Sequence, residues 1–140
     1  MGQQRIEIDK EFPFPVSDLF NHLSEHENLS TLFAPAKVRR VKEGDVEANG
    51  VGSVRRLSLP LTPAFEETVT EFERDRRIAY RITKGSPLRD HHGVMLFSET
   101  AGGSRLQYTI VFKGKLPLIA ALIKPVLDRA IRKGLNDLRL

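Results

Sequence analysis

Two adjacent histidines, His91 and His92, carry the side chains in this sequence that are best suited to chemistry. An imidazole can act as a general base or as a metal ligand near neutral pH. In a β-strand, however, adjacent side chains point to opposite faces, so these two rings cannot bind one ion together. The chain has four histidines and no cysteine, which excludes a thiolate metal site, a disulfide and a cysteine nucleophile. We therefore expect no metal site at this pair, and at most one histidine facing the protein interior.

A glycine pair further along the chain predicts which histidine faces inward. If Gly102 and Gly103 form a two-residue hairpin turn, Phe97 lies opposite Tyr108 in the paired strands. A three-residue turn would reverse the two faces. The two-residue turn gathers on one face His91, Gly93, Met95, Phe97, Tyr108, Ile110 and Phe112.

His91 has two interpretations in this position. It is either a partly buried histidine whose hydrogen bonds are satisfied by backbone or water, or a hydrogen-bonding or acid/base group for a ligand. His92 falls on the other face with three apolar residues, and this patch suggests a homodimer contact: Val94, Leu96 and Val111.

A second histidine pair, His22 and His26, has the i, i+4 spacing of two metal ligands on one helix. Ser24 and Glu27 have the spacing of a capping box, which would start a second short helix directly after the first. Because the helix is then interrupted between the two histidines, we expect them not to share a face and not to bind a metal.

Arg55, Glu67 and Tyr80 are expected to form a polar cluster among apolar residues. Arg55 shares a strand face with two leucines, which favours an inward position. A two-residue turn at 75–76 would pair Glu71 with Tyr80 and bring to one face Glu67, Val69, Tyr80 and Ile82.

Only one of Glu66 and Glu67 can face inward, and the alternation of the strand leaves open which one does. An inward glutamate paired with Arg55 could orient a ligand carbonyl or carboxylate. The alternative is an ion pair between two strands on the outer face of the sheet.

Length and charge limit the class of protein. With 140 residues and a net charge of +4, the chain is long enough for one domain with its own core. Arginine doublets lie in alternating segments, so their charges spread over both strand faces and do not form a nucleic-acid site. No apolar run approaches the roughly 20 residues of a membrane span, and the N-terminus lacks a secretion signal. We expect a cytoplasmic protein without stable membrane insertion.

Residue patterning predicts an α+β fold. A strand is expected at 5–12, two short helices between 15 and 33, and six strands at 36–44, 52–59, 64–73, 77–84, 91–99 and 104–113. Short turns between consecutive strands indicate an antiparallel meander. A long helix at 116–140, kinked at Pro125, must pack on that sheet. Its expected buried stripe is Ile119, Leu122, Ile123, Val126, Leu127, Ala130, Ile131, Leu135 and Leu138.

This order of elements and several local phrases resemble the START-like superfamily, in its bacterial polyketide cyclase/dehydrase branch, often called SRPBCC. The phrases are FPFPVSDLFNHLSEHENLS, GVGSVRRL, FEETVTEFERDRRIAYRI and GSPLRDHHGVM, and the similarity covers residues 1–140. The resemblance implies a single ligand-binding domain of helix-grip fold, in which a curved seven-stranded antiparallel sheet surrounds the C-terminal helix and an apolar cavity lies between them. Members bind lipids, sterols, hormones, quinones or polyketides, and some are cyclases or hydrolases. The resemblance also favours Arg55, Glu67 and Tyr80 as site residues.

The leading hypothesis is a carrier or sensor that binds a small hydrophobic molecule, such as a lipid, a polyketide or a quinone, without a cofactor or metal. The alternative is a polyketide cyclase- or dehydratase-like enzyme that uses His91 or Glu67 as an acid/base group in the same cavity. A third hypothesis is contact of the final helix with a lipid surface. The expected ligand-binding residues are Arg55, Glu67, Val69, Tyr80, His91, Met95, Phe97, Tyr108, Ile110 and Leu122.

Overall fold

The computed structural model describes residues 3–60, 63–86, 88–115 and 118–140. Seven strands form one sheet in the order β1-β7-β6-β5-β4-β3-β2, and all neighbouring strands are antiparallel. The strands are β1 (Gln4–Phe12), β2 (Lys37–Lys42), β3 (Val54–Ser58), β4 (Phe65–Glu73), β5 (Arg77–Lys84), β6 (Leu88–Thr100) and β7 (Gly103–Gly114). The helices are α1 (Val16–Ser24), the short 3-10 helix η1 (His26–Ser30) and α2 (Ile119–Asn136).

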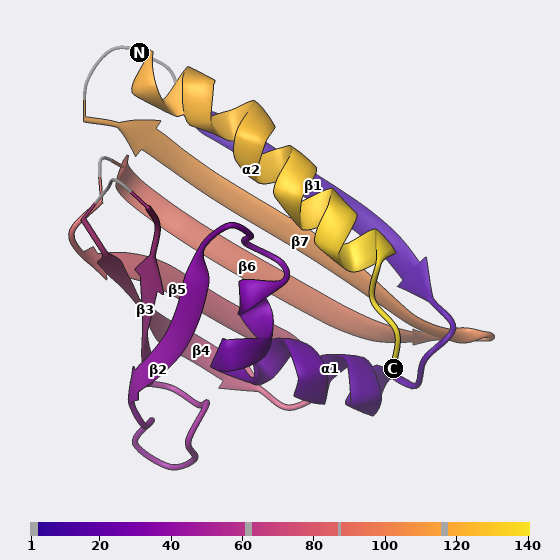
Figure 1. Ribbon diagram of the computed structural model, residues 1–140. Coiled ribbons are helices and arrows are strands. Elements are labelled where there is room, and N and C mark those ends of the chain that lie inside the picture. Colours follow the sequence, from indigo (N-terminus) through magenta and orange to yellow (C-terminus); the bar gives the residue numbers. More distant parts are fainter. Residues whose placement is uncertain (1–2, 61–62, 87, 116–117) are drawn as a thin grey trace.

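The helices cover one face of the sheet. α2 runs along β1 and β7, and α1 and η1 lie lower in the view, over the remaining strands (Figure 1). η1 packs against β2, and α1 contacts β6 and β7. This arrangement confirms the predicted helix-grip fold, including the two short helices after the first strand and the long helix at the end. None of the helices in the described ranges is long and apolar enough to cross a membrane.

The two short helices do not meet through the predicted capping box. The Ser24 hydroxyl donates to the carbonyl oxygen of Asn21 at 3.1 Å. The Glu27 carboxylate accepts a hydrogen bond from the backbone N–H of Arg40 at 2.9 Å. Because both side chains bond to other groups, the capping box is wrong. The break between the helices instead falls at Glu25, whose backbone is extended.

The register of β6 and β7 differs from the prediction by two residues. Thr100 lies opposite Gly103, so the turn is at 101–102 and the predicted pairing of Phe97 with Tyr108 is wrong. Gly103 is therefore the first residue of β7, where its backbone passes close to the end of β1. A Cβ at Gly103 would lie 2.1 Å from the carbonyl oxygen of Phe12. A shift of two residues returns every side chain to the same face, so the predicted division into inner and outer residues survives.

The histidine pair confirms this division. His91 is buried, with 6% of its surface exposed, and His92 lies exposed on the outer face. Of the apolar residues expected beside His92, Leu96 is 39% exposed, and Val94 and Val111 are half-buried. The outer face therefore carries the predicted apolar patch, but only Leu96 in it is largely exposed.

A bulge in β4 restores the predicted faces of β4 and β5, although the register differs from the prediction. The turn has three residues, 74–76, instead of the predicted two, so Glu71 lies opposite Ala79 and not opposite Tyr80. A bulge between Val69 and Glu71 then brings Val69 opposite Tyr80. Glu67 lies on the same buried face as these two residues. The predicted pairing is wrong, but the predicted grouping is confirmed for Glu67, Val69 and Tyr80, and Ile82 lies opposite Glu67 as a half-buried residue.

α2 buries only part of the predicted apolar stripe. Ala120, Ile131 and Leu135 are buried, whereas Leu122 and Val126 are 67% and 63% exposed. Leu122 and Ile131 lie nine positions apart, which at about 3.6 residues per turn places them on opposite sides of the helix. The expectation that Leu122 and Val126 belong to the packed stripe is therefore wrong. α2 is also continuous through Pro125.

Candidate functional site: a buried polar cluster

A buried ion pair joins β3 and β4 on the inner face of the sheet. Arg55 and Glu67 lie opposite each other in the register of these strands, and Arg55 Nε donates to Glu67 Oε1 at 2.7 Å. The two residues are 2% and 4% exposed. Glu66 instead pairs with Arg56 on the outer face, at 3.0 Å from Nη2 to Oε2. The sequence did not decide which of Glu66 and Glu67 faces inward, and in the structure it is Glu67.

His26 extends this pair toward η1. Arg55 Nη1 lies 3.1 Å from His26 Nδ1. Because a guanidinium only donates, His26 Nδ1 must accept, and the neutral ring carries its hydrogen on Nε2. Nε2 then donates to the hydroxyl of Ser53 at 2.9 Å. Burial, followed by repulsion from Arg55, lowers the pKa of His26 to about 3. His26 is therefore a neutral, fixed acceptor for Arg55.

His91 bonds to β5 at a point where the backbone pairing of β5 with β6 has ended. The described pairing of these strands ends where Tyr80 lies opposite Gly93. Two residues further along β5, the backbone N–H of Ile82 donates to His91 Nδ1 at 3.1 Å, so the ring replaces a strand partner. Burial lowers the pKa of His91, and the neutral ring carries its hydrogen on Nε2, 3.8 Å from Glu67 Oε2. In this tautomer His91 can donate a hydrogen bond from Nε2 but has no free lone pair to accept a proton.

Two tyrosines complete the cluster. The hydroxyls of Tyr80 and Tyr108 are hydrogen-bonded to each other, and each residue is 1% exposed. The Arg55 guanidinium lies over the Tyr80 ring, with Cζ 4.3 Å from the ring centroid, which is a cation–π contact. Burial is the main cause that raises the pKa of both phenols. The Tyr80 ring fits because the neighbouring residue of β6 is Gly93, where a Cβ would lie 2.3 Å from Tyr80 Cζ.

The cluster is close to electrically neutral but has an unused donor. The charges of Arg55 and Glu67 cancel, and burial favours the neutral forms of His26 and His91. Arg55 Nη2 is buried and has no hydrogen-bond partner among the described residues. A buried donor that is left unsatisfied costs roughly 1–3 kcal/mol, and more when the group is charged. The arrangement can therefore receive one further hydrogen-bond acceptor without an added charge.

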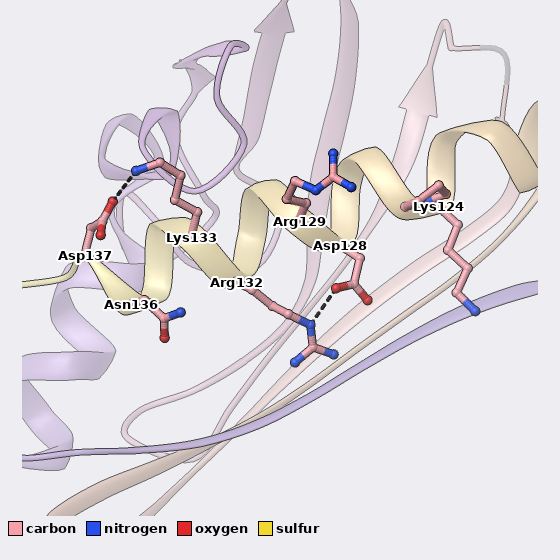
Figure 2. A pocket seen from close by; sticks show the side chains of 8 residues that line it. Lys124, Asp128, Arg129, Arg132, Lys133, Asn136 and Asp137 are labelled. Atoms are coloured by element: carbon pink, nitrogen blue, oxygen red, sulfur yellow. Dashed lines mark hydrogen bonds and ion pairs between the residues drawn. The ribbon is translucent and has the colours of Figure 1, made fainter.

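The predicted aromatic and apolar site residues belong to the core that encloses this cluster. Most of them are buried together in one core: Val69, Tyr80, Met95, Phe97, Tyr108 and Ile110. Leu122 is the exception, because it lies exposed on α2. Two open hollows lie elsewhere, one of about 700 Å³ along the outer side of α2 (Figure 2) and one of about 600 Å³ beside the turn between β4 and β5. Of the predicted site residues, Phe97 alone lines one of these two hollows.

Sequence reasoning missed His26 and Ser53 as members of the cluster. It considered His26 only as a partner of His22, which instead lies beside Asn28. Ser53 precedes Arg55 by two residues, so the alternation of β3 already placed both on one face. The position of His26 depends on how η1 packs against β2, and no periodicity in the sequence reports that packing.

The fold and the cluster together define a helix-grip protein with a polar group enclosed in an apolar interior. Residues 3–140 match the family described as polyketide cyclase / dehydrase and lipid transport, and the chain belongs to this family. The resemblance seen in the sequence is thereby confirmed. Among curated proteins, no significant match exists.

Solved structures share the fold along nearly the whole chain. DR_A0006 from Deinococcus radiodurans is 16% identical, with a TM-score of 0.66 over 94% of this chain and 91% of that one. Ara h 8.0201 is 18% identical, with a TM-score of 0.64 over 97% and 100%. A point mutant of norcoclaurine synthase from Thalictrum flavum, in complex with a transition-state analogue, is 13% identical, with a TM-score of 0.69 over 97% and 91%. At these identities the likeness establishes the fold alone.

Proposed function

We propose that this protein binds a small hydrophobic molecule between the sheet and α2, and that Arg55 holds a neutral hydrogen-bond acceptor of that molecule. The observation that carries the proposal is the buried Nη2 of Arg55, which has no partner among the described residues. The family description includes lipid transport, which supports an apolar ligand. A ligand carbonyl, ester or amide oxygen would satisfy this nitrogen.

The charge of the cluster selects a neutral ligand group. Arg55 is already neutralised by Glu67 at 2.7 Å, so a ligand carboxylate would bring a second negative charge into a buried site. Burying a charge without a partner is costly, whereas a neutral oxygen only completes the hydrogen bonding. The apolar part of the ligand would gain about 25 cal/mol per Å² of surface removed from water.

Side chains around the cluster would have to yield to the ligand. Met95 lies in the core beside the tyrosines, and methionine adapts its shape readily. Ile123 and Leu127 of α2 pack against the core but are only partly buried. A ligand that enters beneath α2 would replace water at these two residues and reach the cluster from that side.

The first experiment is native mass spectrometry of protein purified without detergent, followed by organic extraction and identification of any bound compound. The second measures binding of three probes: a long-chain methyl ketone, the fatty acid of equal length and the corresponding alkane. The ketone is expected to bind best. If the fatty acid binds best, or if no probe and no co-purified compound binds, the proposal is wrong.

A matched pair of double variants tests the role of Arg55. R55M/E67L replaces the inner ion pair by apolar residues of similar size and avoids an unpaired buried charge. R56M/E66L makes the same change on the outer face. The inner variant is expected to lose ketone affinity about tenfold or more, because a hydrogen bond to a charged group is removed. The outer variant should bind the ketone like the unaltered protein.

An enzyme is the second candidate, because His91 and Glu67 lie together in a closed site. In the tautomer described, His91 would donate a proton from Nε2, and Glu67 would be the base in a cyclisation or dehydration. His91→Asn should then abolish turnover while it leaves ketone affinity nearly unchanged, because the amide oxygen can still accept from Ile82. Loss of affinity without any detectable turnover would favour the binding protein.

A further inference from the structure

α2 carries a line of exposed apolar side chains that no other part of the described structure covers. Leu118, Leu122 and Val126 are 76%, 67% and 63% exposed. They are spaced four residues apart, so they lie along one side of the helix, away from the side that packs on the sheet. Isolated apolar residues on a surface need no explanation, but a continuous line on one helix indicates an interaction surface.

Basic residues continue this line and flank its beginning. Arg129 follows Val126 by three residues and lies on the same side of α2. Figure 2 shows Arg129 and Lys133 on one side of α2, with Asp128 and Arg132 on the other. Asp128 is bound to Arg132 at 2.5 Å, so it leaves Arg129 without an acidic partner in the described structure.

The sequence before α2 is free of acidic residues. No aspartate or glutamate occurs between Glu99 and Asp128, whereas this stretch contains Lys113, Lys115 and Lys124. Lys115 is exposed at the end of β7, close to where the chain enters α2. Of these lysines, Lys113 pairs with Asp90 at 3.8 Å. Lys115 therefore provides the positive charge near the start of the apolar line.

We propose that this docking surface, made of Leu118, Leu122, Val126, Arg129 and Lys115, holds the protein on membranes that contain anionic phospholipids. Exposed apolar side chains insert at the boundary between headgroups and acyl chains, and basic residues are attracted by the negative surface of the membrane. Attachment is peripheral and reversible. A second copy of the chain fits this surface poorly, because a two-fold contact would bring the two sets of positive charges together.

The docking surface is separate from the buried cluster. Leu122 and Arg129 are exposed on the outside of α2, whereas Arg55 and Glu67 are enclosed on the inner face of the sheet. Docking can therefore fail while ligand binding holds, and R55M/E67L should still attach to vesicles. The two proposals are tested independently.

A single tryptophan gives a local signal, because the chain contains none. Leu122→Trp is measured with vesicles of phosphatidylcholine alone and of phosphatidylcholine with about one third phosphatidylglycerol, at low ionic strength. We expect a blue shift of the emission with the anionic vesicles only. Val46→Trp is the matched control, since Val46 is 95% exposed at a loop far along the chain from α2. Equal shifts of both tryptophans, or no shift of either, would overturn the proposal.

Vesicle sedimentation measures the contribution of charge and of apolar contact. K115Q/R129Q should lower the partition coefficient about fivefold per removed charge. K37Q/R39Q, which removes two exposed charges from β2, is the matched control and should change it little. L122Q/V126Q should abolish sedimentation without unfolding, because both side chains are exposed. Sedimentation that is equal on both vesicle types, or a stable dimer that L122Q/V126Q dissociates, would assign the surface to something other than an anionic membrane.

Discussion

Arg55 and Glu67 pair across β3 and β4 with 2.7 Å between Nε and Oε1, and both side chains are almost completely buried. The adjacent residues, Arg56 and Glu66, form a similar pair at 3.0 Å on the opposite face, where the arginine side chain is 43% exposed. The same two strands thus carry one ion pair in the interior and one at the surface. This contrast makes the energetic cost of burial directly measurable.

Breaking the inner pair should destabilise the protein far more than breaking the outer pair. Glu67→Leu leaves the Arg55 charge buried without a partner, which costs about 3–5 kcal/mol. Glu66→Leu exposes its partner to water and should cost about 1 kcal/mol or less. Urea denaturation of both variants gives the two free energies of unfolding.

R55M/E67L should recover much of the stability lost in Glu67→Leu, because apolar residues can replace a buried ion pair at little cost. Equal costs for the two single variants, or a double variant that is less stable than Glu67→Leu, would contradict this account. The expected rescue distinguishes loss of a charge partner from loss of packing volume.

Between about pH 6.5 and pH 3, His26 is neutral in the folded protein but protonated in the unfolded chain. The free energy of unfolding should therefore fall as the pH is lowered through this range. The unfolded chain protonates this histidine near 6.5, whereas the folded protein does so at about 3. Between these values the unfolded state binds the additional proton, so acid favours unfolding, by at most about 1.4 kcal/mol per pH unit. Urea midpoints between pH 4 and 8 would measure the slope.

His26→Asn should reduce that slope and retain an amide oxygen that can accept from Arg55. Above pH 7 the profiles of the variant and the unaltered protein should run parallel, because His26 is neutral in both states there. A variant whose slope between pH 4 and 6 equals that of the unaltered protein would show that His26 does not carry the effect.

The tyrosine pair should resist ionisation until the protein unfolds. Burial raises the pKa of Tyr80 and Tyr108 above their ordinary value of 10.0. The unfolded chain therefore loses these protons first, and the stability that the pair contributes is present below pH 10 and lost above it. The chain has two tyrosines and no tryptophan, so tyrosinate absorbance reports this pair alone. A reversible tyrosinate signal near pH 10 in the folded protein would refute the burial of the pair.

Gly93→Ala should destabilise the fold by roughly 1–3 kcal/mol, because the new Cβ overlaps the Tyr80 ring. The distance from that Cβ to Tyr80 Cζ would be 2.3 Å. Gly102→Ala is the matched control, since nothing lies within 4 Å of a Cβ at that position. Thermal unfolding compares the two. Tyr80→Leu added to Gly93→Ala should restore part of the loss, and a lack of any rescue would point to backbone strain instead of the ring.

The inward faces of the strands were predictable from the sequence because a strand alternates with a period of two. His91 and Tyr80 are buried as expected, even though both hairpin registers differ from the prediction, and Glu67 is the inward member of the glutamate pair that the alternation left open. The β6–β7 register is shifted by two residues, and the β4–β5 register is shifted by one residue at the turn and by a second residue at the bulge. Either change keeps each side chain on its predicted face, so the wrong turn positions did not alter which residues were expected at the site.

Features that depend on contacts between distant elements could not be predicted in this way. His26 joins the cluster because η1 packs on β2, and Leu122 is exposed because α2 contacts the sheet along one narrow side. Glu27 matched a helix cap but binds the backbone of Arg40. In each case the sequence pattern was compatible with two partners, and tertiary packing decided between them.

The join between β5 and β6 has a mechanical consequence. β1 pairs with β7 along its whole length, whereas β5 and β6 pair only from Arg77 opposite Leu96 to Tyr80 opposite Gly93. Beyond that point the imidazole of His91 links the two strands by accepting a hydrogen bond from the backbone N–H of Ile82. At this end of the sheet, a side chain takes the place of the backbone ladder between the two strands. His91 thus does for β5 and β6 what a ladder hydrogen bond does elsewhere in the sheet, and it does so through a side chain that a substitution can remove.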